Sequence, residues 1–212
     1  MIIVFAKAPV PGQAKTRLIP RLGAWRAARL HARLIRETIQ TALAARCGAV
    51  ELHGTRPHSI FRSLNVCFRL QRGNDLGERM YRALARSRGP AIVIGTDCPA
   101  LTPADLQRAA RWLRGGYDAV IAPAEDGGYA LFGTNHPKRE WFEGIEWGGS
   151  AVYAETVKRV QNYRWRALRR VWDVDRPEDL ERLRSLRLAS RSRRRALQSP
   201  CSPARSGGLG RT

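Results

Sequence analysis

The sequence predicts an α/β fold, in which a mostly parallel central sheet has helices on both faces. Short apolar runs rich in Ile and Val support this prediction, and residues 2–6 and 91–94 are the clearest of them. Because these runs lack the polar alternation of a half-exposed strand, they suit strands that are covered on both faces. A longer segment, residues 24–45, repeats its apolar residues at helical intervals, as expected for a helix that packs on a sheet.

The other elements are expected in turn along the chain. Residues 2–6 make a natural first, central strand, and residues 24–45 form the long helix. After them we expect strands over 50–53, 66–70, 91–94 and 119–122, a strand resuming at Tyr129, and helices near Asp75, from Pro103 and from Ala151. The expected N-caps are Asn74 or Asp75, then Thr102, then Ser150, since short polar side chains accept from the first N–H groups of a helix. Residues 170–180 alternate like a strand, and residues 177–186 form the expected last helix.

Length and composition predict one catalytic domain, residues 1–188, followed by a basic tail, residues 189–212. A chain of 212 residues suits one sizeable α/β domain. The tail is mostly Ser, Arg, Pro and Gly, and so little apolar surface cannot offset the entropy lost on ordering, so we expect it to be disordered. No apolar run approaches 18 residues and the first six residues do not make a secretory signal. We therefore expect a cytoplasmic protein without a membrane partner.

The formal net charge is +20 at pH 7. The excess is spread over both parts of the chain, since residues 184–212 hold eight Arg and no acidic residue. This charge predicts affinity for anions. The Arg residues show neither interleaved aromatics nor a nucleic-acid-binding module, so a basic, non-enzymatic nucleic-acid-binding protein is only the remote alternative. The four Cys lack the CxxC spacing and the His pairing of a zinc site.

The apolar run over 91–94 leads directly into Gly95-Thr96-Asp97. Pro99 prevents the strand from continuing, and Gly95 frees the backbone to turn. Asp97 is therefore held at the carboxyl end of a strand, where open α/β sheets bind their ligands. The segment predicts a metal ligand beside a bound phosphate, and an Asp that only caps a turn is the alternative.

The loop after the first strand holds two prolines, Gly12, Lys15 and Arg17. The prolines restrict the loop and Gly12 permits close backbone approach. Arg17 can grip a phosphate by its fork, and Lys15 can act as a point charge. The loop lacks the GxxxxGK[ST] spacing of a Walker A motif. We expect a polyphosphate clamp, with an ordinary basic surface loop as the alternative.

Three further stretches carry candidate residues. Asp126-Gly127-Gly128-Tyr129 predicts a tight polar turn whose amides are open to a ligand, with a plain Asp-Gly turn as the alternative. Trp147 lies in another glycine-rich loop. Asp173 and Asp175 share one face if their segment is a strand, which suits a metal pair; Asp175 as a helix N-cap is the alternative. Arg79, in the first turns of the helix after Asp75, is an anion-facing or a solvated Arg.

Taken together, these segments resemble one family. Residues 1 to about 186 look like the bacterial arsenosugar-biosynthesis glycosyltransferases, also described as radical-SAM/selenodomain-associated transferases, of the GT-A nucleotide-diphospho-sugar transferase superfamily. The motifs that carry the resemblance are residues 6–12 (AKAPVPG), 15–18 (KTRL), 73–80 (GNDLGERM), 95–99 (GTDCP), 123–129 (PAEDGGY) and 173–180 (DVDRPEDL). Functional relatives of that family include the phospholactate and molybdopterin guanylyltransferases.

The resemblance implies a Rossmann-like GT-A fold with a nucleotide bound over the first loop. Lys15 and Arg17 would lie on its phosphates, and a divalent metal, Mg²⁺ or Mn²⁺, would be held by Asp97 in the place of the DxD acid. The other implied donor-binding positions are Ala6, Ala8, Pro9, Gly12, Arg79, Gly95 and Thr96. Residues 96–98 carry one carboxylate where a DxD has two, so Asp173 or Asp175 is the expected second metal ligand.

We therefore expect a metal-dependent glycosyltransferase that moves a sugar from a nucleotide-diphospho-sugar to a small acceptor. Metal and cations would neutralise the leaving pyrophosphate. A nucleotidyltransferase that releases pyrophosphate from a nucleoside triphosphate needs the same chemistry and is the alternative. In either reaction Asp126 is expected to orient or deprotonate the acceptor, and Tyr129 and Trp147 to shape its pocket. The sequence carries no signal for the oligomeric state.

Overall fold

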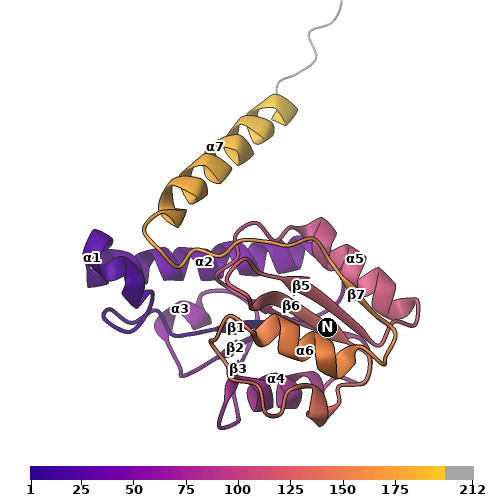
Figure 1. The fold of residues 1–212 in the computed structure, drawn as a ribbon. Helices are drawn as coiled ribbons and strands as arrows, with labels where there is room; N and C mark the ends of the chain where they lie inside the picture. Colours follow the sequence, from indigo (N-terminus) through magenta and orange to yellow (C-terminus); the bar gives the residue numbers. More distant parts are fainter. Residues whose placement is uncertain (199–212) are drawn as a thin grey trace, which may run out of the picture.

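The computed structural model describes residues 1–198, and the side chains of residues 1–189. Its centre is a seven-stranded sheet with the strand order β3-β2-β1-β4-β6-β5-β7 (Figure 1). The strands are β1 (Ile2–Ala6), β2 (Val50–Gly54), β3 (Cys67–Leu70), β4 (Ala91–Gly95), β5 (Ala119–Pro123), β6 (Tyr129–Thr134) and β7 (Trp165–Ala167). Only β6 runs antiparallel to its neighbours within this sheet, so the expected mostly parallel α/β fold is confirmed.

Helices cover both faces of the sheet, as Figure 1 shows. The helices are α1 (Ile19–Leu22), α2 (Ala24–Ala45), α3 (Ser59–Arg62), α4 (Leu76–Leu84), α5 (Pro103–Arg114), α6 (Val152–Val160) and α7 (Asp179–Gln198), with 3₁₀ turns η1 (Thr16–Leu18) and η2 (Arg139–Trp141). Residues of α2, α3 and α5 share a core with one face of the sheet, and residues of α4 and α6 share a core with the other. None of the helices described here is long and apolar enough to cross a membrane.

Two cores explain why the strand sequences show no polar alternation. Successive residues of β1 point to opposite faces of the sheet. Ile2 and Val4 enter the core under α2 and α5, whereas Ile3 and Phe5 enter the core under α4 and α6. Every residue of β1 is buried. A strand that is buried on both faces needs apolar residues at every position.

Strand direction brings three loops to one edge of the sheet. β1 and β4 are parallel neighbours in register, with Phe5 opposite Gly95, so the loops that follow them leave the sheet together. β5 is antiparallel to β6, and β6 is antiparallel to β4. β5 therefore runs in the direction of β4 and ends at the same edge.

The expected N-cap residues are confirmed for α4 and α5 but not for α6. Thr102 caps α5 and forms a reciprocal capping box with Asp105, and Asp75 caps α4 by accepting from the N–H of Glu78. The expected cap by Ser150 is wrong. The N-cap of α6 is Ala151, with no side-chain cap.

The C-terminal part departs from the expected elements. Residues 170–180 are not a regular strand: β5 ends at Pro123, and beyond it only an isolated bridge joins Ala124 to Val171. The three-residue β7 is an unexpected edge strand. Asp175 does not cap the last helix, because α7 begins at Asp179, whose carboxylate accepts from the N–H groups of residues 175 and 176.

Helix α7 runs to Gln198, past the expected helix end at 186 and past the expected domain boundary at 188. Leu, Ala and Arg are strong helix formers, so an Arg-rich segment with little apolar surface can still be helical. Figure 1 shows α7 projecting away from the body of the molecule. The rest of the expected tail, residues 199–212, lies outside the described residues.

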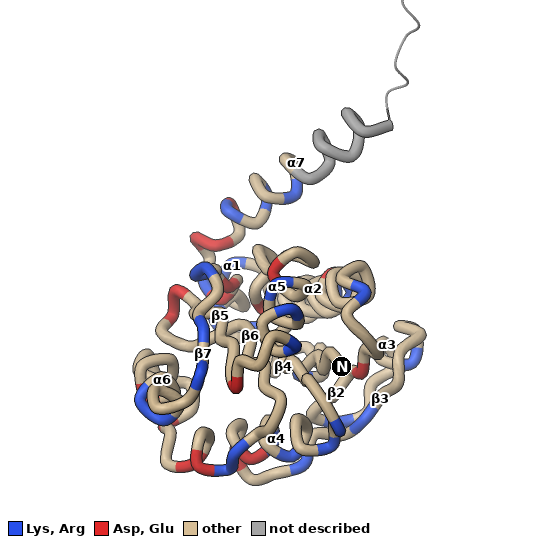
Figure 2. The backbone as a smooth tube through the Cα atoms, turned by 90° about the vertical axis from the view of Figure 1, so that its right-hand side faces the viewer, with Lys and Arg blue, Asp and Glu red and all other residues tan. Residues whose placement is uncertain are grey.

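The basic excess is not gathered on one element. Figure 2 shows Lys and Arg on β3, β7, α4, α6 and α7, with Asp and Glu between some of them. Many of these charges are paired along one helix, as Arg82 is with Glu78 and Lys158 with Glu155. Within residues 1–189 the basic residues are thus spread over several elements.

Candidate active site

The candidate site lies at the sheet edge where β1, β4 and β5 end. Lys15 and Arg17 follow β1, Asp97 follows β4, and Asp126 follows β5. The N–H of Val174 donates to the backbone carbonyl of Asp97 at 2.8 Å, which brings the segment with the last two acids to the same edge. The stretches that the sequence singled out, distant along the chain, therefore meet in space.

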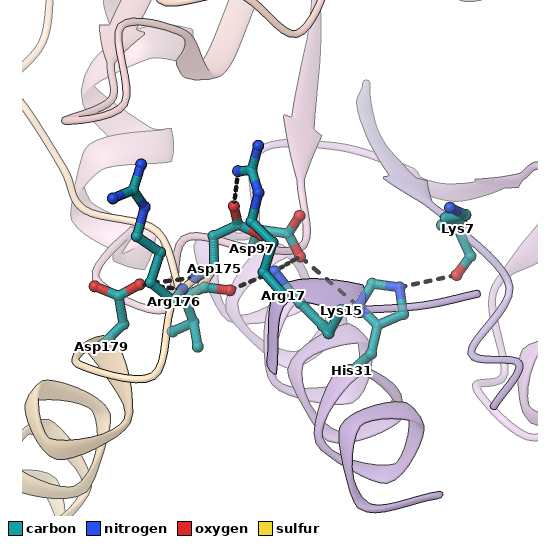
Figure 3. A network of polar contacts seen from close by, with 9 residues as sticks. Lys7, Lys15, Arg17, His31, Asp97, Asp175, Arg176 and Asp179 are labelled. Atoms are coloured by element: carbon teal, nitrogen blue, oxygen red, sulfur yellow. Dashed lines mark hydrogen bonds and ion pairs between the residues drawn. The ribbon is translucent and has the colours of Figure 1, made fainter. Parts of the chain in front are cut away.

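Lys15 and Asp97 form the inner ion pair of the site (Figure 3). The Lys15 Nζ lies 2.8 Å from Asp97 Oδ1, and the same ammonium donates to the carbonyl oxygen of Val174. The Lys15 side chain is 4% exposed, whereas that of Asp97 is 49% exposed. Lys15 adopts a left-handed backbone conformation, with φ of 52°, directly before η1. The contact joins the loop after β1 to the tip of β4.

Arg17 and Asp175 form the outer pair (Figure 3). The Arg17 Nη1 donates to Asp175 Oδ2, and this carboxylate raises the pKa of the guanidinium. Both expected phosphate-binding cations thus hold an expected metal-binding acid in the ligand-free protein. The arrangement neutralises two carboxylates, and it also means that a bound donor has to compete with them.

The charges of Asp97, Asp126 and Asp173 all act on one buried thiol. Burial raises the pKa of Cys98 well above its ordinary value, and the charges of these three carboxylates raise it further. Cys98 is 8% exposed. The three acids come from different loops, and each is near enough to Cys98 for its charge to raise the pKa of the thiol.

Asp173 carries the least compensated negative charge of this group. Burial raises its pKa to about 6, with further contributions from the carboxylates of Asp126 and Asp175. Such an acid keeps its proton to a higher pH than an ordinary Asp does, and a bound cation would favour its ionised form. The expected strand that would place Asp173 and Asp175 on one face is absent, and Asp175 is paired with Arg17.

The donor atoms of the site fit a hard divalent cation. Carboxylate oxygens are the ligands that Mg²⁺ and Mn²⁺ prefer, and Mg²⁺ commonly uses only one or two of them together with waters and substrate phosphates. Within residues 1–189 no group of three or more His, Cys, Asp or Glu side chains is placed to hold a metal ion. Asp97 is 49% exposed although it is paired with Lys15, and Asp173 is in no ion pair within residues 1–189, so these are the acids that could hold such a cation; Asp175 is paired with Arg17.

The turn at Asp126 combines a structural role with its place in the site. Asp126 Oδ1 accepts from the N–H of Gly128 at 2.9 Å, which closes the expected Asp-Gly turn. Gly127 has φ of 89°, and a Cβ there would lie 1.9 Å from the backbone oxygen of Ser150. The glycine is therefore needed for the turn to pack against the start of α6. Its role in binding an acceptor stays a prediction.

Tyr129 and Trp147 pack against each other beneath this turn. Their rings make an edge contact with centroids 6.3 Å apart, and burial raises the pKa of the Tyr129 phenol. The Trp147 ring also lies against Gly77 of α4, where a Cβ would come within 2.6 Å of it. Both side chains join the core under α4 and α6. Their packing is clear, and their expected part in an acceptor pocket stays a prediction.

The expected nucleotide-binding positions divide into buried and open ones. The buried residues are Ala6, Ala8, Pro9 and Thr96. Gly12 and Gly95 border open space, since no heavy atom lies within 4 Å of a Cβ built at either position. A ligand can therefore approach the backbone at these two glycines. The Nε of Arg79 donates to the carbonyl of Gly73 and closes the loop before α4, and its expected contact with an anion stays a prediction.

One residue of the site was missed by sequence reasoning. His31 of α2 is 3% exposed, its Nε2 lies 3.0 Å from the carbonyl oxygen of Lys7, and its Nδ1 lies 3.7 Å from Asp97 Oδ1. Burial lowers its pKa. The available signal was a lone His on the buried face of an amphipathic helix, between Ala28 and Leu34, and such a signal cannot name a partner.

Comparison with solved structures gives relatives of the same fold. A protein from Desulfovibrio desulfuricans G20, described as a candidate nucleotide-diphospho-sugar transferase, is 31% identical over 82% of this chain and 81% of its own, with a TM-score of 0.75. A nucleotidyl transferase from Methanothermobacter is 17% identical over 90% and 99%, with a TM-score of 0.65. A CMP:2-keto-3-deoxy-manno-octonic acid synthetase in complex with CTP is 11% identical over 90% and 98%, with a TM-score of 0.61.

The two structures that are 17% and 11% identical show only that the fold is shared. The Desulfovibrio protein, at 31% identity, is also similar in sequence. No curated protein matches the chain. Residues 34–149 match a family described as "uncharacterized protein conserved in bacteria" (DUF2064), and they make up more than half of the chain. The matched region includes the β4 tip and the glycine-rich turn at Asp126. Because the match spans more than half of the chain, the protein belongs to the DUF2064 family.

Proposed function

We propose that this protein is a metal-dependent transferase that moves a sugar from a nucleotide-diphospho-sugar to a small acceptor. The observation that carries the proposal is the ion pair of Lys15 with Asp97 at the edge where β1 and β4 end, together with the backbone hydrogen bond from Val174 to Asp97, which brings Asp173 to the same edge. Ligands of open α/β sheets bind at such an edge. The 31% identical relative described as a candidate nucleotide-diphospho-sugar transferase supports the donor class. Membership of the arsenosugar-biosynthesis group stays a prediction.

The residues of the chain divide the work between donor and acceptor. Arg17 is exposed and can leave Asp175 for the donor phosphates, which it grips by two parallel hydrogen bonds. The Lys15 side chain is buried and holds Asp97 in place by their ion pair. Asp126, which lies near Asp173 in the same pocket of negative charge, is the proposed group that orients or deprotonates the acceptor hydroxyl.

Asp97 and Asp173 would hold the metal, and Asp175 becomes available if Arg17 moves to the donor. When bound, a divalent cation supplies Lewis-acid neutralisation of the pyrophosphate that departs with the nucleotide. The raised pKa of Asp173 supports this assignment. Neighbouring carboxylates repel each other, and a bound cation would remove that repulsion.

Nucleotidyl transfer is the second candidate function. The segment 96–98 favours it, because Asp97 stands between Thr96 and Cys98, which are both buried and neither of which is a second acid. A GT-A glycosyltransferase commonly has two acids in its DxD motif, and this chain has one there. Release of pyrophosphate from a nucleoside triphosphate needs a metal and cations to neutralise the phosphates, which Asp97, Lys15 and Arg17 can provide.

Two assays separate the candidates. The protein is incubated with Mn²⁺ and either labelled nucleotide sugars or nucleoside triphosphates, after a thermal-shift screen has shown which nucleotide raises the melting temperature. Transfer or release of the sugar supports the first proposal. Pyrophosphate release from a triphosphate without sugar transfer reverses the order of the two, and a protein that no nucleotide stabilises contradicts both.

A further inference from the structure

A cavity of about 450 Å³ lies between the first turns of α7 and the two helices α1 and α2. Figure 1 shows the start of α7 beside these helices. Pockets that bind small molecules typically enclose about 300–1,000 Å³. None of the described residues that line the cavity is a proposed metal, donor or acceptor position. The cavity is therefore a candidate binding site of its own, outside the proposed active site.

Leucines from all three helices form the apolar part of the cavity wall. They are Leu22, Leu30, Leu180, Leu183 and Leu188. Leu183 is 3% exposed and belongs to a core that joins α7 to α2, whereas Leu22, Leu30 and Leu180 are only partly buried against that core. Leu188 is 58% exposed. An alkyl chain in the cavity would cover leucine surface that is now partly in contact with water, which favours binding.

Arginines from α2 and α7 form the polar part of the same wall. Arg26 and Arg33 line it from α2, and Arg184 and Arg187 line it from α7. Glu37 lies 2.9 Å from the guanidinium groups of both Arg33 and Arg187, so two of the cations share one carboxylate. Arg26 and Arg184 are exposed and have no ion-pair partner among residues 1–189. Four positive charges against one negative charge leave an excess of three.

This excess of positive charge decides between the possible occupants. Residues 199–212 contain two Arg and no acidic residue, and a second copy of the chain would bring the same arginines and a net charge of +20, so charge opposes both. A purely apolar molecule would leave Arg26 and Arg184 unpaired, and a free phosphate ion would leave the leucines uncovered. The lining therefore matches a molecule with an alkyl chain and an anionic head. A phosphate monoester carries about −1.5 to −2 charges at pH 7, so it matches the excess better than a carboxylate does.

We propose that this cavity binds a single-chain alkyl phosphate as a monomer, with its chain against the leucines and its phosphate on Arg26 and Arg184. A guanidinium group can bind two phosphate oxygens by parallel hydrogen bonds. A cavity between helices can enclose one chain, whereas a bilayer presents an extended surface of head groups. The proposal involves neither a metal nor a nucleotide, so it does not rest on the proposed function, and a failure of that function leaves its test unchanged.

The test measures binding of decyl phosphate to the full chain by isothermal titration calorimetry, below the concentration at which the ligand forms micelles. Arg26→Gln combined with Arg184→Gln should weaken binding about tenfold or more, because charge-assisted hydrogen bonds to the phosphate are lost. The matched control combines Arg29→Gln with Arg36→Gln, which removes the same charge from exposed positions of α2 that do not line the cavity. The control should keep the affinity within about twofold, because salt screens exposed charges that do not contact the ligand.

Two further probes separate the head from the chain. Butyl phosphate has the same head and should bind at least about tenfold more weakly than decyl phosphate, because it covers less of the leucine surface. Decanol has the same chain without the charge, so it should bind more weakly than decyl phosphate and equally well to the wild type and to the Arg26→Gln, Arg184→Gln variant. In NMR, decyl phosphate should shift the amide signals of Leu30 and Leu183, which come from the two sides of the cavity.

Several results would contradict the proposal. Equal weakening in the two double variants would assign the binding to the overall charge of the protein, and equal affinities for butyl and decyl phosphate would remove the leucines from the site. Binding to phosphatidylglycerol vesicles without binding of monomeric decyl phosphate would assign the arginines to a membrane surface instead. The replaced arginines are exposed, so the melting temperature should stay unchanged. If the double variant does not fold, Arg184→Gln alone is compared with Arg36→Gln.

Discussion

The two cations of the loop after β1 are only two residues apart, yet they are held in opposite ways. Lys15 has a side chain that is 4% exposed and has two acceptors, Asp97 and Val174. Arg17 has a side chain that is 67% exposed and pairs with Asp175. Lys15 precedes η1 and Arg17 lies within it, so two neighbouring positions hold a buried, inner ion pair and an exposed, outer one.

This difference assigns the cations different tasks. An exposed ion pair contributes roughly 0–1 kcal/mol, so Arg17 can exchange Asp175 for a phosphate at little cost. Removing one partner of a buried pair leaves a charge without compensation, which costs more. Lys15 is thus better suited to fixing Asp97 than to following a donor, although the sequence alone gave both cations the same role.

The largest expected effect comes from removing the inner acid. Asp97→Asn should lower transferase activity by roughly 100-fold or more, because one charged group that stabilises the reacting phosphates is lost. It should also lower the free energy of unfolding by about 2 kcal/mol, because the Lys15 ammonium stays buried without its partner. Steady-state kinetics and urea unfolding measure the two effects.

The outer acid provides the matched control. Asp175→Asn should change stability by no more than about 0.5 kcal/mol, because its partner Arg17 is already solvated. If Asp97→Asn and Asp175→Asn cost the same stability, the distinction between an inner and an outer pair is wrong. If Asp97→Asn keeps full activity and metal dependence, Asp97 is only a turn residue.

A second and smaller contrast is expected between the cations. Arg17→Met should raise the KM for the donor about tenfold without lowering the melting temperature, since an exposed phosphate contact is lost. Lys15→Met should lower the melting temperature by about 3 °C or more, because it leaves Asp97 Oδ1 buried with no cation.

Ionic strength distinguishes the same two variants. The donor KM of the wild type should rise with salt because Arg17 is exposed, and this rise should be reduced in Arg17→Met. Lys15→Met should keep it. A wild-type KM that is insensitive to salt, or a melting temperature that falls as far in Arg17→Met as in Lys15→Met, contradicts the contrast.

Most of the sheet could be predicted, because its strands are buried on both faces and their apolar runs are unambiguous. β1, β4 and β5 fall within a residue of their expected bounds. β7 could not be predicted, because its three residues are half-exposed or exposed and are held mainly by pairing with β5. Strands of that kind depend on a neighbour that the local sequence does not contain.

The site was predictable as a set of loops but not as a set of contacts. Strand ends supplied Asp97 and the cations, whereas the acceptor for Lys15 is the backbone carbonyl of Val174, 159 positions away, which has no side-chain signal. Glu51 and His53 are two residues apart on the same strand face, and the carboxylate of Glu51 lies 2.9 Å from the Nε2 of His53. That contact was readable from the period of the strand.

The smallest expected effect is that of the Asp126 charge on the pKa of Asp173. Asp126→Asn should lower the pKa of Asp173 below about 6, because a neighbouring negative charge is removed while burial, the larger cause, remains. Carboxyl carbon NMR of Asp173 between pH 3 and pH 8, roughly, measures the change. The shift should stay under about one unit, since the burial contribution persists.

The same titration has a consequence for stability whose sign can be worked out. In the folded protein Asp173 keeps its proton to about pH 6, whereas in the unfolded chain it loses it near the ordinary value of 3.8. Its contribution to stability is therefore complete below the lower value and is lost as the pH rises through the upper one. Asp126→Asn should make this loss smaller, and so should added Mn²⁺ if Asp173 binds it. A pKa of Asp173 that stays the same in Asp126→Asn would place Asp126 outside the site, and only its turn with Gly128 would remain.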